Sequence, residues 1–467
     1  MQIKIKLRHS KYDIKIVKVS VMMKQQSLKH KHITSFQIII LGFLSMIILG
    51  SILLMLPVAT RDGNGAVFSD ALFTATSAVC VTGLVMHDTA TYWSMFGQSV
   101  ILFLIQIGGM GIVTVAVSVA AFSGRKIGLM QRSTMQEAVS AHHLGGIVRL
   151  TKFILKITVC IELVGTVLLL PVFIRDFGIM KGIWYALFHS ISAFCNAGFD
   201  LIGVKEPFSS LTSYSSKPFL NFTVMALIII GGIGFLTWED IKNNKLHFRK
   251  YRMQSKVILT VTGILVILPA LYFFFFEYQS LPPGERILTS LFQSVTPRTA
   301  GFNTTDLTSF SETGQMLVIL LMLIGGSPGS TAGGMKTTTI AVLVSSALSV
   351  FRKKEDTHFF KRRIPDDTVK SAATIFLLYI GLFIGGGMII SRLENIPLLT
   401  SLFETGSAIG TVGLTLGITP QLGIISQFIL IVLMFFGRVG GLTLIFAAMT
   451  KTAANASKYP QEKITLG

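Results

Sequence analysis

Charged residues are scarce in this chain. Asp, Glu, Lys and Arg make up 13% of its 467 residues, whereas 51% of the residues are hydrophobic. Soluble domains carry roughly 25% charged residues. Stretches that lack all four charged residue types occur at 34–58, 94–122, 218–238, 257–276 and 371–390. Because a membrane-spanning helix needs about 20 consecutive apolar residues, the composition indicates a polytopic membrane protein and argues against a soluble one.

Acidic residues are in the minority. The chain has 41 Lys and Arg against 22 Asp and Glu, which gives a net charge of +19. In a soluble protein such an excess would suggest a nucleic-acid partner. Here the basic residues gather between the apolar stretches, as expected for loops that stay in the cytoplasm. We therefore expect the lipid bilayer, and no nucleic acid, as the surroundings of this chain.

Cysteines and clustered metal ligands are few. The three cysteines, Cys80, Cys160 and Cys195, form no CxxC pair and have no His at metal-ligand spacing. We expect them to be reduced and packed, without a metal site or a disulfide framework. His, Asp and Glu do not cluster within the apolar stretches, which argues against a membrane enzyme or a scaffold with a polar cavity. The chain is therefore predicted not to be an enzyme.

Two glycine-rich stretches resemble nucleotide-binding motifs but fail in detail. Residues 329–337 read GSTAGGMKT, in which Met335 separates the glycine from the lysine of a phosphate-binding loop. No β-strand pattern precedes this stretch. Gly109 and Gly111 fail as a dinucleotide fingerprint because Thr114 replaces the third glycine. We expect no organic cofactor in this chain.

The first 33 residues hold nine Lys or Arg and have no apolar run or small-residue cleavage site. A signal peptide needs both of these features. The segment is therefore predicted to be a cytosolic basic tail. Met22 and Met23 leave open a later natural start, in which case the first 21 residues would have little structural role.

A fourfold internal repeat organises the rest of the chain. The dipeptide Leu-Phe begins four similar segments, LFTATSAVCVTG at 72, LFHSISAFCNAG at 187, LFQSVTPRTAG at 291 and LFETGSAIGTVG at 402. A glycine follows each Leu by eleven residues, or by ten in the third segment. Each segment is too short to span a bilayer but suits a re-entrant half-helix between two full spans. The sequence predicts an all-α polytopic membrane protein of four tandem helix, pore-loop, helix repeats, with eight transmembrane helices.

The repeats and the charges divide the chain. The predicted divisions are a cytosolic tail (1–33), repeat 1 (34–122), a linker (123–149), repeat 2 (150–239), a linker (240–256), repeat 3 (257–351), a linker (352–370), repeat 4 (371–450) and a C-terminal tail (451–467). The three linkers are rich in Lys and Arg, whereas the loops that carry the Leu-Phe segments are poorer in them. We therefore expect a multi-pass plasma-membrane protein with cytoplasmic linkers and cytoplasmic termini.

The four glycine-ended segments predict a cation pore. Non-helical backbone at membrane depth is tolerated only where it is buried in protein or lines a water-filled cavity, so four such segments need a shared cavity. A ring of backbone carbonyls replaces the hydration shell of K⁺ in potassium filters. The predicted filter residues, whose carbonyls would bind K⁺, are Val81, Thr82, Gly83, Asn196, Ala197, Gly198, Thr299, Ala300, Gly301, Thr411, Val412 and Gly413. Such a filter carries no mark of a coupling ion, so sodium dependence stays open.

A glycine-rich interruption divides the second helix of repeat 3. It comprises Gly325, Gly326, Ser327, Pro328, Gly329, Ser330, Thr331, Ala332, Gly333 and Gly334. Ten consecutive small residues with a proline cannot form a stable helix interior. We expect this stretch, 325–334, to lie beneath the filter as an intramembrane gate. A small-residue packing interface between helices is the alternative, but it explains Pro328 poorly.

Arg438 occupies the position at which the other repeats have Gly109, Gly232 or Gly326. A charge at the middle of the membrane costs about 2.5 to 3.5 kcal/mol on insertion scales and indicates a function. Pointing inward, the guanidinium would be an electrostatic barrier to cations just inside the filter and part of the gate. The alternative is an ion pair with Glu162, the acidic residue inside a predicted span of repeat 2.

Over residues 34–450 the chain resembles the Trk/Ktr/HKT superfamily of potassium transporters, and in particular the membrane subunits of bacterial Ktr systems. The resemblance rests on the four repeats, the four glycines, the interruption at 325–334 and Arg438. It implies a pseudo-fourfold pore within one chain, a homodimer, and gating by a cytosolic nucleotide-binding ring of RCK type. A secondary transporter with inverted repeats also contains broken helices, but the four repeats here share one orientation.

Overall fold

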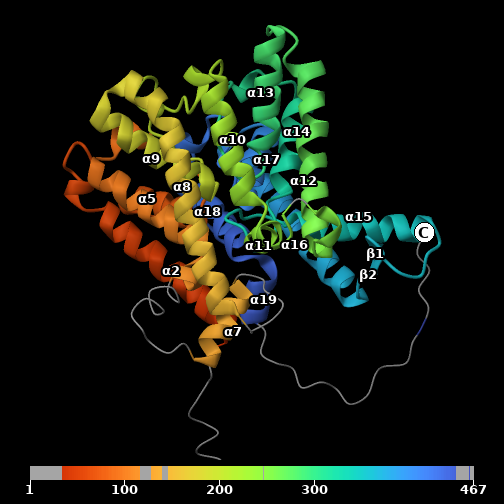
Figure 1. Ribbon diagram of the computed structural model, residues 1–467. Helices are drawn as coiled ribbons and strands as arrows, with labels where there is room; N and C mark the ends of the chain where they lie inside the picture. The colour runs from red at the N-terminus through yellow and green to blue at the C-terminus, as the bar shows by residue number, and fades with distance from the viewer. Residues whose placement is uncertain (1–33, 116–127, 139–145, 246, 449–461, 463–467) are drawn as a thin grey trace, which may run out of the picture.

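The computed structural model describes residues 34–115, 128–138, 146–245, 247–448 and 462. The predicted N-terminal tail, the predicted C-terminal tail apart from residue 462, and residues 123–127 and 139–145 of the first linker lie outside the described residues. Each quarter of the chain contributes a long helix, then a short helix, and then a second helix that is also shorter than the long one (Figure 1). The long helices are α2 (Ser35–Leu54), α8 (Ile147–Phe177), α12 (Met253–Tyr272, continued by a π-helical turn over Phe273–Glu277) and α16 (Asp366–Glu394).

The remaining helices follow the same order in each quarter. The short helices are α3 (Phe68–Cys80), α9 (Ile179–Cys195), α13 (Pro283–Val295) and α17 (Leu398–Gly410). The second helices are α5 (Met95–Met110), α10 (Pro218–Gly232), α14 (Glu312–Leu323) and α18 (Ile424–Val439). The other helices are α4 (Thr89–Tyr92), α7 (Leu129–Ala138), α11 (Phe235–Asn244), α15 (Thr337–Phe351) and α19 (Gly441–Ala448).

The long helices carry the membrane signal. Within the described residues, four helices are long and apolar enough to cross a membrane, or five if α10 and α11 form one bent span. The second helices are apolar but shorter, so length and composition alone do not identify all eight predicted spans. The all-α membrane fold is confirmed. Its exception is a hairpin of two-residue strands, β1 (His358–Phe359) and β2 (Arg362–Arg363), which lies with α15 to one side of the helices (Figure 1).

The second helices break at a common point. We expected only repeat 3 to be interrupted, but α5 and α18 also end there, with Gly111 and Gly440 as their C-caps, and Gly234 separates α10 from α11. These glycines have φ of 84°, 92° and 89°, a conformation that costs a residue with a Cβ atom far more. The axes of α10 and α11 differ by 98°. The predicted uninterrupted spans at 94–122 and 218–238 are therefore wrong, because a recurring Gly-x-Gly step ends the helix inside each of them.

The four quarters close into a circle. Each second helix packs against the short helix of the next quarter, in the pairs α5 with α9, α10 with α13, α14 with α17 and α18 with α3. The Phe of each Leu-Phe pair anchors this packing, because Phe73, Phe188, Phe292 and Phe403 are all fully buried. Burial of one such ring stabilises a fold by about 1.5 to 3 kcal/mol relative to exposure. The packing places the carboxyl ends of the four short helices around one centre.

Candidate functional site

The predicted filter segments follow directly after the short helices α3, α9 and α17, and the third segment follows α13 after three further residues. All four share the same φ signs at their first and last residues. The first residue of each segment lies in the left-handed region, with φ of 58°, 59°, 71° and 51° at Val81, Asn196, Thr299 and Thr411. The last residue is a glycine with φ of 92°, 70°, 79° and 93° at Gly83, Gly198, Gly301 and Gly413. A non-glycine residue with positive φ is uncommon and marks a constrained site. The twelve predicted residues therefore form four turns with positive φ at both ends.

The four glycines lie in a closed ring. A Cβ atom on each glycine would meet the carbonyl oxygen that precedes the glycine of the next repeat, in the pairs Gly83 with Ala197, Gly198 with Ala300, Gly301 with Val412 and Gly413 with Thr82. The last pair returns from repeat 4 to repeat 1, so the ring has no gap. The structure thus brings together all twelve residues that the sequence proposed as a filter.

A cavity of about 390 Å³ opens on one side of this ring and is lined by all four glycines. Asp88, Asp200 and Asp306 also line it. Carboxylates at the wall of a cleft make its potential negative and raise the local concentration of cations. The cavity is therefore suited to collect cations next to the ring.

The stretch 325–334, here called the gate loop, connects α14 to α15 on the other side of the ring. Toward repeat 2, the amide of Ser327 donates to the Gly232 carbonyl at 3.0 Å, and the Thr331 hydroxyl donates to the Phe194 carbonyl at 3.0 Å. Toward repeat 4, the amide of Gly334 donates to the Gly437 carbonyl at 3.1 Å. The loop therefore lies between repeats 2 and 4, against the carboxyl ends of their short helices.

Arg438 connects the gate loop to repeat 1. Its guanidinium donates to the carbonyls of Thr331 and Gly108, and to the Gly109 carbonyl at 3.0 Å. Among the described residues Arg438 forms no ion pair. The alternative of an ion pair with Glu162 is wrong, because both oxygens of that carboxylate accept from the Gln106 amide, at 2.9 and 3.1 Å. The positive charge of Arg438 thus stays without an acidic partner in the described part of the chain.

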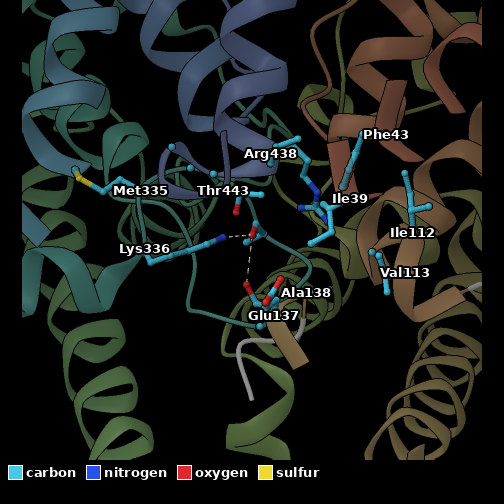
Figure 2. Close-up of a pocket in the computed structure, with 18 of the residues that line it drawn as sticks. Ile39, Phe43, Ile112, Val113, Glu137, Ala138, Met335, Lys336, Arg438 and Thr443 are labelled. Atoms are coloured by element: carbon cyan, nitrogen blue, oxygen red, sulfur yellow. Dashed lines mark hydrogen bonds between the residues drawn. The ribbon is translucent and has the colours of Figure 1, made fainter. Parts of the chain in front are cut away.

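Lys336 is a second cation at this place, and the sequence patterns did not single it out. Its ammonium donates to the carbonyls of Ala332 and Gly333 in the gate loop, at 2.8 and 3.3 Å. Together with Arg438 it lines a cavity of about 300 Å³, and Figure 2 shows both side chains reaching into this cavity, which Glu137 of α7 also lines. The sequence signal was a lysine two residues after the last glycine of the interruption, next to an apolar helix.

Side chains of the short helices also bond to the filter segments, and they were not among the predicted site residues. Ser77, Ser192, Thr296 and Ser407 stand five residues after the Leu of each Leu-Phe pair. The Glu404 carboxylate accepts from the hydroxyls of Thr415 and Thr419 and from the Leu416 amide, just past the fourth glycine. A hydroxyl residue at the same place in all four segments was the available signal.

The cysteines follow the expectation in part. All three are free, and Cys80 and Cys195 are buried beside the first residues of their filter segments. Cys160 is exposed on α8, so the expectation that it is packed is wrong. The reason is that α8 is apolar on its outer face as well, where lipid rather than protein covers a membrane helix.

Known proteins are similar to this chain over most of its length. The model of the TrkH family, described as cation transport protein, matches residues 7–459. This chain belongs to the TrkH family. The potassium/sodium uptake protein NtpJ of Enterococcus hirae is 41% identical over 448 residues, which cover 94% of this chain and 98% of that protein.

Further relatives of this TrkH-family chain cover nearly its full length. The Ktr system potassium uptake protein B of Bacillus subtilis is 38% identical and covers 96% of this chain and 100% of that protein. The corresponding protein of Vibrio alginolyticus is 34% identical, with 92% and 94% coverage. The crystal structure of the potassium transporter TrkH from Vibrio parahaemolyticus superimposes with a TM-score of 0.72 over 90% of this chain and 86% of that one, at 19% identity. That likeness shows the fold.

Proposed function

We propose that this TrkH-family protein takes up K⁺ across the plasma membrane through one central pore, with the four filter segments as its selectivity filter. Each chain would form a complete pseudo-fourfold pore. The carbonyls of the twelve filter residues would replace the hydration shell of K⁺. The cavity with Asp88, Asp200 and Asp306 would receive the ion from outside.

The closed ring of glycines carries this proposal. Each glycine lies so close to the carbonyl of the next repeat that no side chain fits between them. Such contact brings four non-helical segments to one axis, where their polar backbone needs a water-filled or ion-filled path. The names of two relatives, a potassium/sodium uptake protein and a potassium uptake protein, agree with K⁺ as cargo. These relatives are transporters, which also argues against an enzyme.

The gate loop and Arg438 would close the pore from the cytoplasmic side. Support comes from their hydrogen bonds, which join repeats 1, 2, 3 and 4 across the inner face of the ring. We further propose that the protein works as a homodimer with a cytosolic nucleotide-binding ring of RCK type, docked on the basic linkers. The name of the Bacillus subtilis relative, which is one protein of a Ktr system, supports a second component.

Purified protein in liposomes tests this function. We expect the flux of K⁺ to exceed that of Na⁺, and addition of the regulatory ring to increase it. Repeating the assay with and without Na⁺ decides between independent and sodium-dependent uptake. An enzyme or a scaffold would move no cation, and flux that is strictly tied to a co-substrate would favour an alternating-access carrier.

A further inference from the structure

Near the carboxyl end of each short helix, one hydroxyl side chain forms a hydrogen bond with the backbone at the filter glycine or at the residue after it. The four residues are Ser77, Ser192, Thr296 and Ser407, one from each repeat, and all four are fully buried. Their equivalence follows from the repeats, since each stands five residues after the Leu of its Leu-Phe pair. We call these four residues the hydroxyl clamp.

The backbone carbonyl of each clamp residue holds the filter segment at a first point. The amides of Thr82, Ala197 and Val412 donate to the carbonyls of Ser77, Ser192 and Ser407, each at 2.8 Å. In repeat 3 the amide of Ala300 donates to the Thr296 carbonyl at 3.0 Å. The residue before each filter glycine is therefore fixed to the short helix.

The hydroxyl groups hold the filter segments at a second point, in two ways. In repeats 1 and 4 the Ser77 and Ser407 hydroxyls accept from the amides of Gly83 and Gly413, each at 3.0 Å. In repeats 2 and 3 the hydroxyls of Ser192 and Thr296 instead donate to the carbonyls directly after the glycines, those of Phe199 at 2.7 Å and Phe302 at 2.6 Å. In repeats 1 and 4 the bonded peptide group is therefore the one that ends at the filter glycine, and in repeats 2 and 3 it is the one that begins at the residue after the glycine.

We propose that the hydroxyl clamp positions the filter carbonyls and thereby sets the discrimination between K⁺ and Na⁺; this inference rests on the proposed function of the ring as a filter. A turn with positive φ at both ends has no helix or sheet ladder to hold it, so side chains must supply the restraint. Leaving a buried amide or carbonyl without a partner is costly. Without the hydroxyl the peptide group reorients, and the ring loses its fit to one ion size.

Thr296→Val is the sharpest test, because valine keeps the shape of threonine and removes only the donor. Thr296→Ser keeps the donor and serves as the conservative variant. The Ser290 hydroxyl, on α13 six residues before Thr296, is also buried and has no hydrogen-bond partner. Ser290→Ala is therefore a matched control for the loss of a buried hydroxyl.

In repeat 1 the same comparison uses Ser77→Ala against Thr76→Val, since the Thr76 hydroxyl is buried beside Ser77 without a partner. Ser77→Thr retains the hydroxyl there. Uptake is measured in liposomes as KM and Vmax for K⁺, with Na⁺ as competitor, on protein whose folding is checked by size exclusion. We expect Thr296→Val and Ser77→Ala to raise KM for K⁺ about tenfold and to strengthen competition by Na⁺, while the controls and conservative variants match the wild type.

Two outcomes distinguish a failure of the hydroxyl clamp from a failure of the filter assignment on which it rests. If Thr296→Val and Ser77→Ala behave like their controls while Gly413→Ser alters selectivity, the clamp is overturned and the filter assignment stands. If Gly413→Ser is also without effect, the filter assignment itself fails. A lower Vmax at unchanged KM and unchanged Na⁺ competition would likewise overturn the inference, because it would indicate less active protein rather than altered selectivity.

Discussion

The four filter glycines occupy positions at which a Cβ atom would not fit. Each glycine combines positive φ with direct contact to the neighbouring carbonyl, and the two requirements are separable. Gly417, four residues after Gly413, also has positive φ, but a Cβ atom there would meet nothing within 4 Å. A comparison of the two positions therefore isolates the contact from the backbone strain.

Replacing Gly413 by Ser should relax discrimination against Na⁺ and weaken K⁺ uptake by about tenfold or more, because the new Cβ atom displaces the Thr82 carbonyl. Gly83→Ser, Gly198→Ser and Gly301→Ser should act in the same direction. The measurement is the ratio of K⁺ to Na⁺ flux in liposomes, with Gly417→Ser as the control. Wild-type selectivity in all four filter variants would exclude the filter assignment.

Arg438 is a second single residue with a predicted effect, because its positive charge has no acidic partner in the described residues. Arg438→Ala should raise the maximal K⁺ flux about threefold or more with little change in selectivity, because it removes a buried positive charge from the path of cations. It also releases the gate loop carbonyl of Thr331. Lys353→Ala, which removes an exposed basic residue, controls for a general effect of charge. An unchanged maximal rate in Arg438→Ala would argue that the guanidinium has only a packing role.

At the scale of the elements, the gate loop is held by hydrogen bonds to backbone carbonyls of repeats 2 and 4 and by the side chains of Arg438 and Lys336, which donate to its own carbonyls. A segment of small residues buries little apolar surface, so its displacement costs little compared with that of a packed helix. This makes the loop suitable as a movable element. The helices on either side of the loop are packed against other elements: α14 contacts α17, and α15 contacts α16 and β1 of the hairpin.

Deletion of Ser330–Ala332 should raise basal K⁺ flux and reduce its dependence on the regulatory ring, because it removes the bonds from Thr331 to repeats 2 and 4. Flux in liposomes with and without the ring measures both effects. Deletion of the exposed residues Asp62–Asn64 is a control of equal length. If correctly inserted deletion protein keeps wild-type flux and ring dependence, the loop is a packing feature and the gate lies elsewhere.

At the scale of the whole molecule, the orientation in the membrane remains a prediction from charge. Cysteine labelling from outside should reach exposed positions of the loops that carry the filter, such as Thr91 and Glu206, but not Lys250 or Lys354 in the linkers. Ser210, in the same loop as Glu206, is buried and therefore a poor reporter. The exposed Cys160 is replaced first. Labelling of either linker position from outside would refute the proposed topology.

The sequence by itself determined the repeats, because each quarter must bury the same Phe and form the same turn. Leu-Phe pairs, glycines at fixed distance and hydroxyl residues between them are local requirements of a short helix followed by a filter segment. The four glycine-ended turns and the glycine-rich interruption could therefore be located from the order of residues alone. The breaks at Gly111, Gly234 and Gly440 were also readable, but hydropathy alone concealed them, since apolar residues continue on both sides.

Only the tertiary structure decided which residues of different repeats contact one another. The sequence offered Glu162 as the partner of Arg438, and the fold instead gave this arginine three carbonyls from repeats 1 and 3. It also set the order in which each glycine meets its neighbour and the two directions of the clamp hydrogen bonds. Such contacts join residues that are far apart in the chain. Their geometry depends on how four similar units close into a circle, and no single repeat carries that information.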